Sequence, residues 1–236
     1  MPGTGEGWLL LHGTPLTPAV WEPVAERLRR FGSVQAPDLS TAVDCPTGVS
    51  VQAALAARIL EGLDPSPERL HVAGHSFGGQ VAIEVALLAP PGLCGLTVVC
   101  SRDTPYPAFA PTAAGLRRGD PIDGEVALHR WFRPDELASA SSLVDYARRC
   151  LRDADRATWA RDLDAIAGYD RSGEVGRIAV PVTLVAAELD PVSTPAAMAA
   201  LASRLPAARL RVLTGAAHLS PFARPERLVD LIRGGG

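Results

Sequence analysis

Six short apolar runs, separated by helix-like patterns, constrain the fold of this chain more than any other feature. Between the runs, apolar residues recur at helical spacing over 49–62, 77–89, 195–204 and 222–233. Short, mostly apolar runs joined by helices are typical of buried parallel strands. The pattern predicts an α/β fold with a doubly wound, mostly parallel sheet of about six strands. The six runs are Trp8–Leu11, Ser33–Leu39, Leu70–Ala73, Leu96–Cys100, Val182–Ala187 and Leu210–Leu213.

Residues 104–170 interrupt this alternation. They begin with the proline-rich stretch Thr104–Pro111 and continue with helix-like patterns that include no convincing strand. Roughly 65 residues are more than one crossover between strands needs. We therefore interpret 104–170 as an inserted helical cap, with 1–103 and 171–236 forming the core. A plain long crossover is the alternative interpretation.

The most specific motif is Gly74-His75-Ser76-Phe77-Gly78-Gly79, which matches G-x-S-x-G and lies between an apolar run and an apolar helix pattern. In that context the serine sits on a sharp strand-to-helix turn with its hydroxyl exposed. Gly74 and Gly78 remove side chains that would clash where the strand and helix pack. Because a serine hydroxyl needs a base to become a nucleophile, the motif predicts nucleophilic catalysis by Ser76. A glycine-rich turn with an incidental serine is the alternative.

His218 is the candidate base. It is the only one of the five histidines in a loop at the carboxyl end of a late run, which is the edge where open parallel sheets bind ligands. Asp190, just after the fifth run, is the candidate carboxylate that would fix the imidazole tautomer and stabilise the imidazolium. Asp103 is its rival, because it lies just past the preceding run. The expected chain order of the triad is Ser76, Asp190, His218.

Two backbone amides are expected to stabilise the oxyanion of a tetrahedral intermediate. One is the amide of Phe77, directly after the nucleophile. The other belongs to the turn His12-Gly13-Thr14-Pro15 after the first run. Pro15 has no N–H, so Thr14 is the natural donor. A mere tight turn, with His12 in a structural role, is the alternative for this segment.

Charge and composition exclude several function classes. The net charge of −3 provides no basic field for nucleic acid or an anionic membrane. The chain contains no lysine, which excludes Schiff-base chemistry and a Walker A lysine. The four cysteines lack C-x-x-C spacing, and no apolar run approaches membrane-spanning length. We therefore expect a cytoplasmic protein with reduced cysteines and no nucleic-acid or membrane partner.

Together these residues resemble the α/β-hydrolase superfamily. The resemblance implies an α/β-hydrolase fold, a serine-histidine-aspartate triad, two oxyanion amides and no metal or organic cofactor. The family's sheet usually begins with two further strands, whereas about seven residues precede the first run here, so we expect that N-terminal strand pair to be missing. The 33–39 strand would then lie at an edge. The matching stretches are L-L-H-G-T-P-L-T-P-A-V-W at 10–21, A-G-H-S-F-G-G-Q at 73–80, A-A-E-L-D at 186–190 and G-A-A-H-L-S-P at 215–221.

Within the superfamily, the cap resembles that of 3-oxoadipate enol-lactonases and related bacterial carboxylesterases. The similar stretches are L-H-R-W-F-R-P at 128–134 and D-R-A-T-W-A-R-D-L-D-A-I-A at 155–167. Trp131 and His129 are therefore the candidate substrate-binding residues. The alternatives are that Trp131 belongs to the cap core and that His129 lies on the surface.

The expected function is hydrolysis of a small carboxylic ester through an acyl-enzyme, by a protein acting as a monomer or homodimer. Hydrolysis of a lactone or enol-lactone in aromatic catabolism is the alternative. A dicarboxylate lactone would favour arginines near the pocket. Perhydrolase or haloperoxidase activity, C–C bond hydrolysis and a non-catalytic binding module are further alternatives. The candidate arginines are Arg102, Arg117, Arg118, Arg130 and Arg133.

Overall fold

The computed structural model describes residues 5–63, 67–139 and 141–234, and its centre is one six-stranded sheet in the order β2-β1-β3-β4-β5-β6. All five strand pairings are parallel. The predicted α/β fold with six parallel strands is therefore confirmed. The strands are β1 (Glu6–Leu11), β2 (Ser33–Gln35), β3 (Arg69–His75), β4 (Leu93–Val99), β5 (Val182–Ala187) and β6 (Ala208–Leu213).

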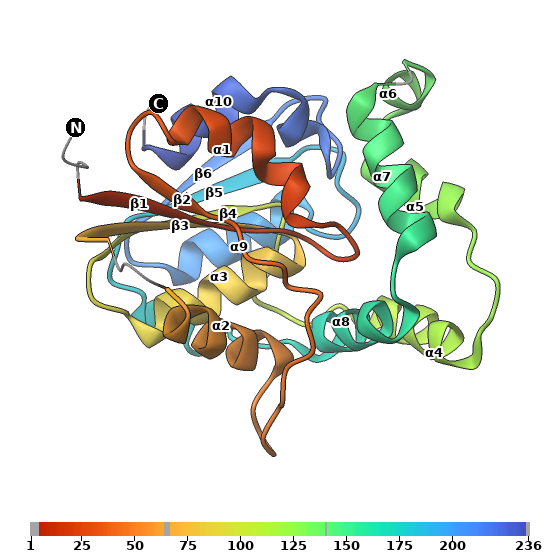
Figure 1. Cartoon of the computed structure of the whole chain (residues 1–236), viewed down its shortest axis with the longest axis horizontal. Helices are drawn as coiled ribbons and strands as arrows, with labels where there is room; N and C mark the ends of the chain where they lie inside the picture. Colours follow the sequence, from red (N-terminus) through yellow and green to blue (C-terminus); the bar gives the residue numbers. More distant parts are fainter. Residues whose placement is uncertain (1–4, 64–66, 140, 235–236) are drawn as a thin grey trace.

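Helices cover both faces of the sheet (Figure 1). On one side lie α1 (Glu22–Leu28) and α10 (Pro225–Ile232), and on the other lie α2 (Val51–Glu61), α3 (Phe77–Leu88) and α9 (Pro195–Arg204). The core also contains the short 3-10 helices η1 (Pro18–Trp21), η3 (Val175–Arg177) and η4 (Ser220–Ala223).

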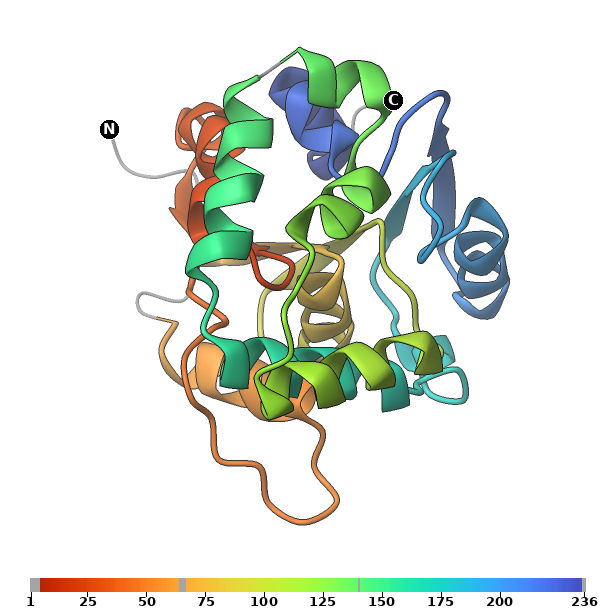
Figure 2. The same ribbon diagram turned by 90° about the vertical axis from the view of Figure 1, so that its right-hand side faces the viewer.

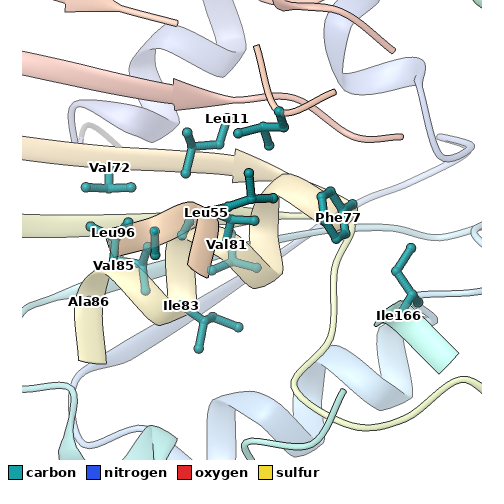
Figure 3. Packing of buried hydrophobic residues seen from close by; sticks show 14 of the residues in the cluster. Leu11, Leu55, Val72, Phe77, Val81, Ile83, Val85, Ala86, Leu96 and Ile166 are labelled. Atoms are coloured by element: carbon teal, nitrogen blue, oxygen red, sulfur yellow. The ribbon is translucent and has the colours of Figure 1, made fainter. Parts of the chain in front are cut away.

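The apolar character of the strands follows from this double covering. Successive side chains of a strand point to opposite faces, so Trp8 and Leu10 pack with the α1 and α10 side, whereas Leu9 and Leu11 pack with the other. Figure 3 shows the second cluster, in which α3 lies against β1 and β3. Because most residues of β1, β3, β4 and β5 are shielded from water on both faces, these strands consist of continuous apolar runs rather than alternating ones.

Strand β2 is shorter than its apolar run suggested. Pairing with β1 ends at Gln35, and residues 36–39 leave the sheet at Pro37, which has no N–H to donate. The strand pairs with β1 alone and lies at an edge of the sheet, as expected. The opposite edge is formed by β6.

Between β4 and β5 the described residues contain helices and no strand. We call residues 104–170 the insertion. It lies beyond the carboxyl ends of the strands (Figure 1). Figure 2 shows it as two layers, with α4 and α8 running side by side below α5, α6 and α7. Its elements are η2 (Pro107–Phe109), α4 (Ala110–Arg118), α5 (Gly124–Trp131), α6 (Pro134–Ala138), α7 (Ser142–Asp153) and α8 (Arg156–Gly168).

The two layers of the insertion continue the two faces of the core. Leu116 of α4 and Leu163 of α8 belong to the apolar cluster of α2 and α3. Leu128 of α5 and Val144 of α7 belong to the cluster of α1 and α10. Among the helices of the described ranges, none combines the length and the apolar character that crossing a membrane requires.

Candidate active site

Ser76 occupies a strained turn between β3 and α3. Its φ of 54° and ψ of −120° lie in a region that side chains rarely adopt. The glycines on either side permit this turn: a Cβ at Gly74 would lie 2.1 Å from the Gly78 carbonyl oxygen, and one at Gly78 would lie 2.3 Å from that of Leu11. The turn therefore has the close strand-to-helix packing that its motif predicted, and it leaves Ser76 half-buried at the carboxyl edge of the sheet.

His218 and Asp190 form a buried hydrogen-bonded pair. Nδ1 of His218 lies 2.6 Å from Oδ2 of Asp190, and Oδ1 of Asp190 accepts the amides of Val192 at 2.8 Å and Ser193 at 3.0 Å. Burial acts to raise the pKa of Asp190, but attraction to His218 and these hydrogen bonds outweigh it, so the pKa lies below its ordinary value. An ionised Asp190 fixes the proton of His218 on Nδ1 and leaves Nε2 as the acceptor.

Ser76 lies with His218 and Thr14 in the wall of one cavity of about 330 Å³. Within the described residues the Ser76 hydroxyl has no hydrogen-bond partner. Contacts between nucleophile and base are often long in the absence of substrate. The arrangement brings all three predicted triad residues to one edge of the sheet.

His75 supports the backbone of His218. The two imidazole rings are 4.6 Å apart, and Nε2 of His75 donates to the carbonyl oxygen of His218 at 3.1 Å. Burial, reinforced by the charge of His218, holds the pKa of His75 well below its ordinary value. His75 is therefore a neutral donor, not a second base.

The turn after β1 lies directly against the nucleophile. A Cβ at Gly13 would be 2.9 Å from Nδ1 of His75 and 3.0 Å from Cβ of Ser76. No hydrogen bond of the described chain occupies the amides of Thr14 and Phe77, so both can donate to a ligand. His12 holds this turn, since its Nδ1 donates to the Gly13 carbonyl at 2.9 Å and its Nε2 accepts the amide of Leu39 at 2.9 Å.

Asp103, the rival carboxylate, has a different partner. Its two carboxylate oxygens accept hydrogen bonds from Nη2 and Nε of Arg204 at 2.7 and 2.8 Å, and its carbonyl accepts the amide of Arg171. In the structure His218 is therefore paired with Asp190, whereas Asp103 joins the segment after β4 to the end of α9.

The cavity runs between the two layers of the insertion, and most of its lining is apolar. Trp131 contributes to the wall and also packs in the apolar core. His129 is exposed and does not line the cavity, because positions two apart on a helix face different directions. The apolar lining includes Phe109, Leu116, Ile122, Trp131, Trp159, Leu163, Ile166 and Val192, and the charged lining is Arg118, Asp120, Asp123 and Arg130.

One group of potential metal ligands occurs among the described residues. Ligand atoms of His75, Cys100 and His218 lie within 4.8 Å of one another. His218 is hydrogen-bonded to Asp190 through Nδ1, and His75 to the backbone of His218 through Nε2. We therefore assign these histidines to the hydrogen-bonded cluster of the site. All four cysteines are free thiols.

Two buried groups beside the site were not singled out from the sequence. The thiol of Cys100 contacts Asp190, and its pKa is raised well above the ordinary value by burial and by that carboxylate. Asp162 on α8 is 2% exposed and accepts two hydrogen bonds from Arg161 at 2.7 and 2.9 Å. No local pattern marks either residue, because tertiary packing brings Cys100 beside Asp190 and Asp162 beside Thr14.

Comparison with known proteins gives a consistent result. A model of the alpha/beta hydrolase family matches residues 8–231. A pimeloyl-[acyl-carrier protein] methyl ester esterase of Aeromonas hydrophila is 27% identical over 98% of this chain and 95% of its own length. A hydrolase of Pseudomonas aeruginosa has a TM-score of 0.85 with 26% identity, covering 98% of this chain and 90% of that one. An enol-lactonase of Burkholderia xenovorans has a TM-score of 0.84 with 21% identity over 97% and 90% of the two chains.

Proposed function

The chain belongs to the alpha/beta hydrolase family, and from that premise we propose that it hydrolyses a small carboxylic ester through an acyl-enzyme. One observation carries the proposal: His218, which a buried 2.6 Å contact joins to Asp190, lies in the same cavity wall as Ser76. A nucleophile, a base and a carboxylate that orients the base are the parts that acyl transfer requires.

The proposed reaction has two halves. Oγ of Ser76 attacks the ester carbonyl carbon while Nε2 of His218 takes the hydroxyl proton, and the amides of Thr14 and Phe77 stabilise the oxyanion. The bond from carbon to the alcohol oxygen then breaks, and His218 protonates the departing alcohol. Water attacks the acyl-enzyme by the same route and releases the acid and Ser76. Asp190 remains ionised throughout.

The size and the mostly apolar lining of the cavity support an ester with an aliphatic or cyclic acyl group. The volume of about 330 Å³ lies at the lower end of the range for small-molecule sites. The insertion acts as a cap over Ser76, with Trp131 as a wall for the acyl or alcohol group. Because the Aeromonas hydrophila relative is a methyl ester esterase, methyl esters are the first alcohol group to test.

Lactone hydrolysis is the second candidate, because one cavity residue could recognise a second carboxylate. Arg130 lines the cavity and has no ion pair within the described ranges, whereas Arg118 is paired with Asp120 at 2.7 Å. The Arg130 guanidinium lies over the Phe109 ring, and a guanidinium without an ion pair is well suited to bind a carboxylate group. A substrate with a second acidic group would therefore favour this alternative.

A panel of methyl and p-nitrophenyl esters of graded acyl length, together with simple and carboxylated lactones, tests the proposal. We expect turnover of esters and covalent labelling of Ser76 by a fluorophosphonate. The Ser76→Ala variant controls for labelling elsewhere. An absence of both turnover and labelling would refute the proposed function, and a strong preference for carboxylated lactones would favour the second candidate.

A further inference from the structure

The loop that carries His218, residues 215–220, is hydrogen-bonded to the insertion. The amide of Leu219 donates to the carbonyl oxygen of Trp131 at 2.9 Å. Nη1 of Arg133 donates to the carbonyl oxygen of Gly215 at 2.7 Å. These contacts connect the loop to the short segment 131–136, which joins α5 to α6, more than 80 positions earlier in the chain.

Glu136 makes the third and most extended of these connections. Its Oε2 accepts the amide of Arg133 at 2.8 Å, which holds the carboxylate at the start of α6. Its Oε1 accepts a hydrogen bond from Oγ of Ser220 at 2.7 Å. Oγ of Ser220 in turn accepts the amide of Ala217 at 2.8 Å. A relay of hydrogen bonds therefore runs from Glu136 to the residue immediately before His218.

Both chain neighbours of His218 are thus held from the insertion. Ala217 is held through Ser220 and Glu136, and Leu219 is held by the Trp131 carbonyl. Asp190 fixes one ring nitrogen of His218 and His75 contacts its carbonyl, but neither contact sets the path of the loop on both sides. Loops position functional groups less precisely than helices or strands unless surrounding hydrogen bonds support them.

We propose that Glu136 is a positioning residue for His218, acting through Ser220 on the backbone of the loop. This inference rests on the proposed role of His218 as the base. A hydrogen bond from a hydroxyl to an ionised carboxylate is among the stronger kinds, so Glu136 can hold Ser220 in the rotamer that accepts the Ala217 amide. Without it, Nε2 of His218 would point less accurately towards Ser76.

The test compares Glu136→Ala with Glu136→Gln. We expect Glu136→Ala to lower kcat about tenfold, less than the loss of about 10²-fold that a 1 Å misplacement can cause, with KM nearly unchanged. Labelling of Ser76 by a fluorophosphonate should slow by the same factor. Glu136→Gln keeps an oxygen acceptor for Ser220 and should recover most of the rate, although its side-chain nitrogen cannot accept the amide of Arg133. Glu125→Ala is the matched control, because Glu125 is an exposed acidic residue of the same insertion whose ion-pair partner is Arg148.

A double-mutant cycle separates the relay from general loosening. Ser220→Ala should lower kcat as Glu136→Ala does, and the double variant should lose little more, because both changes break one relay. Multiplicative losses would overturn the proposal, as would an unchanged kcat in Glu136→Ala with only KM or Tm affected. If Glu136→Ala does not fold, Glu136→Gln and Ser220→Ala decide the question by the same labelling rate. A wild-type protein that neither turns over esters nor reacts with fluorophosphonate would refute the proposed function itself.

Discussion

Two buried aspartates provide a direct test of the site, because their burial is similar and their partners differ. In Asp190→Asn the side chain keeps its shape, but its amide cannot hold the proton of His218 on Nδ1 in the same way. The equivalent change in a serine-histidine-aspartate triad lowers kcat by about 10⁴-fold. At 1.36 kcal/mol for each factor of ten, this corresponds to about 5 kcal/mol of transition-state stabilisation.

Asp103→Asn should have the opposite profile. It removes the charge that faces Arg204, with which Asp103 makes hydrogen bonds of 2.7 and 2.8 Å. Removing one partner of a fully buried pair costs roughly 3–5 kcal/mol. The Arg204 side chain remains 29% exposed, so water can solvate its charge and offset part of this cost. We therefore expect the free energy of unfolding to fall by about 2 kcal/mol. For a chain of this size, Tm should fall by roughly 4–8 °C, while kcat well below Tm should change by less than about twofold.

The assay combines two measurements. Initial rates on a p-nitrophenyl ester are measured at about 20 °C, well below the Tm expected of an ordinary domain. Thermal unfolding is followed by circular dichroism. The reasoning requires the two losses to separate: rate in Asp190→Asn and Tm in Asp103→Asn. If Asp103→Asn instead lost the rate while Asp190→Asn remained active and melted early, Asp103 would be the acid of the triad and our assignment would be refuted.

Three further predictions follow from the same geometry. Ser76→Ala and His218→Ala should each lower kcat by about 10⁴-fold or more, with little further loss in the double variant, because the residues act as a unit; independent losses would contradict the triad. Trp131→Ala should change the ratio of kcat/KM for short against bulky acyl esters by about tenfold, whereas an unchanged ratio with a lower Tm would leave Trp131 as a core residue only. Because the pKa of Asp190 is lowered on folding, its ionised form contributes stability above the unfolded pKa of about 3.9, and this is lost as pH falls through the folded pKa. The difference in unfolding free energy between wild type and Asp190→Asn, measured with denaturant, should therefore shrink on acidification, and a difference that grows would contradict the sign.

The central strands could be predicted from the sequence because they are buried on both faces of the sheet. Each apolar run corresponds to a strand, and the run at 33–39 was too long because pairing depends on an available N–H that Pro37 lacks. The helical character of 104–170 also appeared in the sequence. The layering of the insertion did not, because it depends on which apolar faces meet in space.

Ser76, Asp190 and His218 could be singled out because each lies in the segment that follows a strand, and so at the carboxyl edge of a parallel sheet. The sequence favoured Asp190 but left Asp103 as a rival, since both follow strands; the structure pairs Asp190 with His218 and Asp103 with Arg204. The connection from 131–136 to 215–220 had no sequence signal either. It joins irregular segments that are far apart in the chain, and neither hydrophobic periodicity nor a sequence motif predicts which of such segments will be in contact.

The order of the strands has a consequence for the protein during its synthesis. The first four strands to be synthesised are neighbours in the sheet, in the order β2-β1-β3-β4, and β4 pairs with β5 only after the insertion has been made (Figure 1). At about 5–20 residues per second, residues 100–181 between the two strands take several seconds to leave the ribosome. Throughout that interval the apolar edge at Leu96 and Val98 has no partner strand. The nascent chain is therefore most prone to self-association at this stage, and chaperone capture should be strongest while residues 104–181 are being translated.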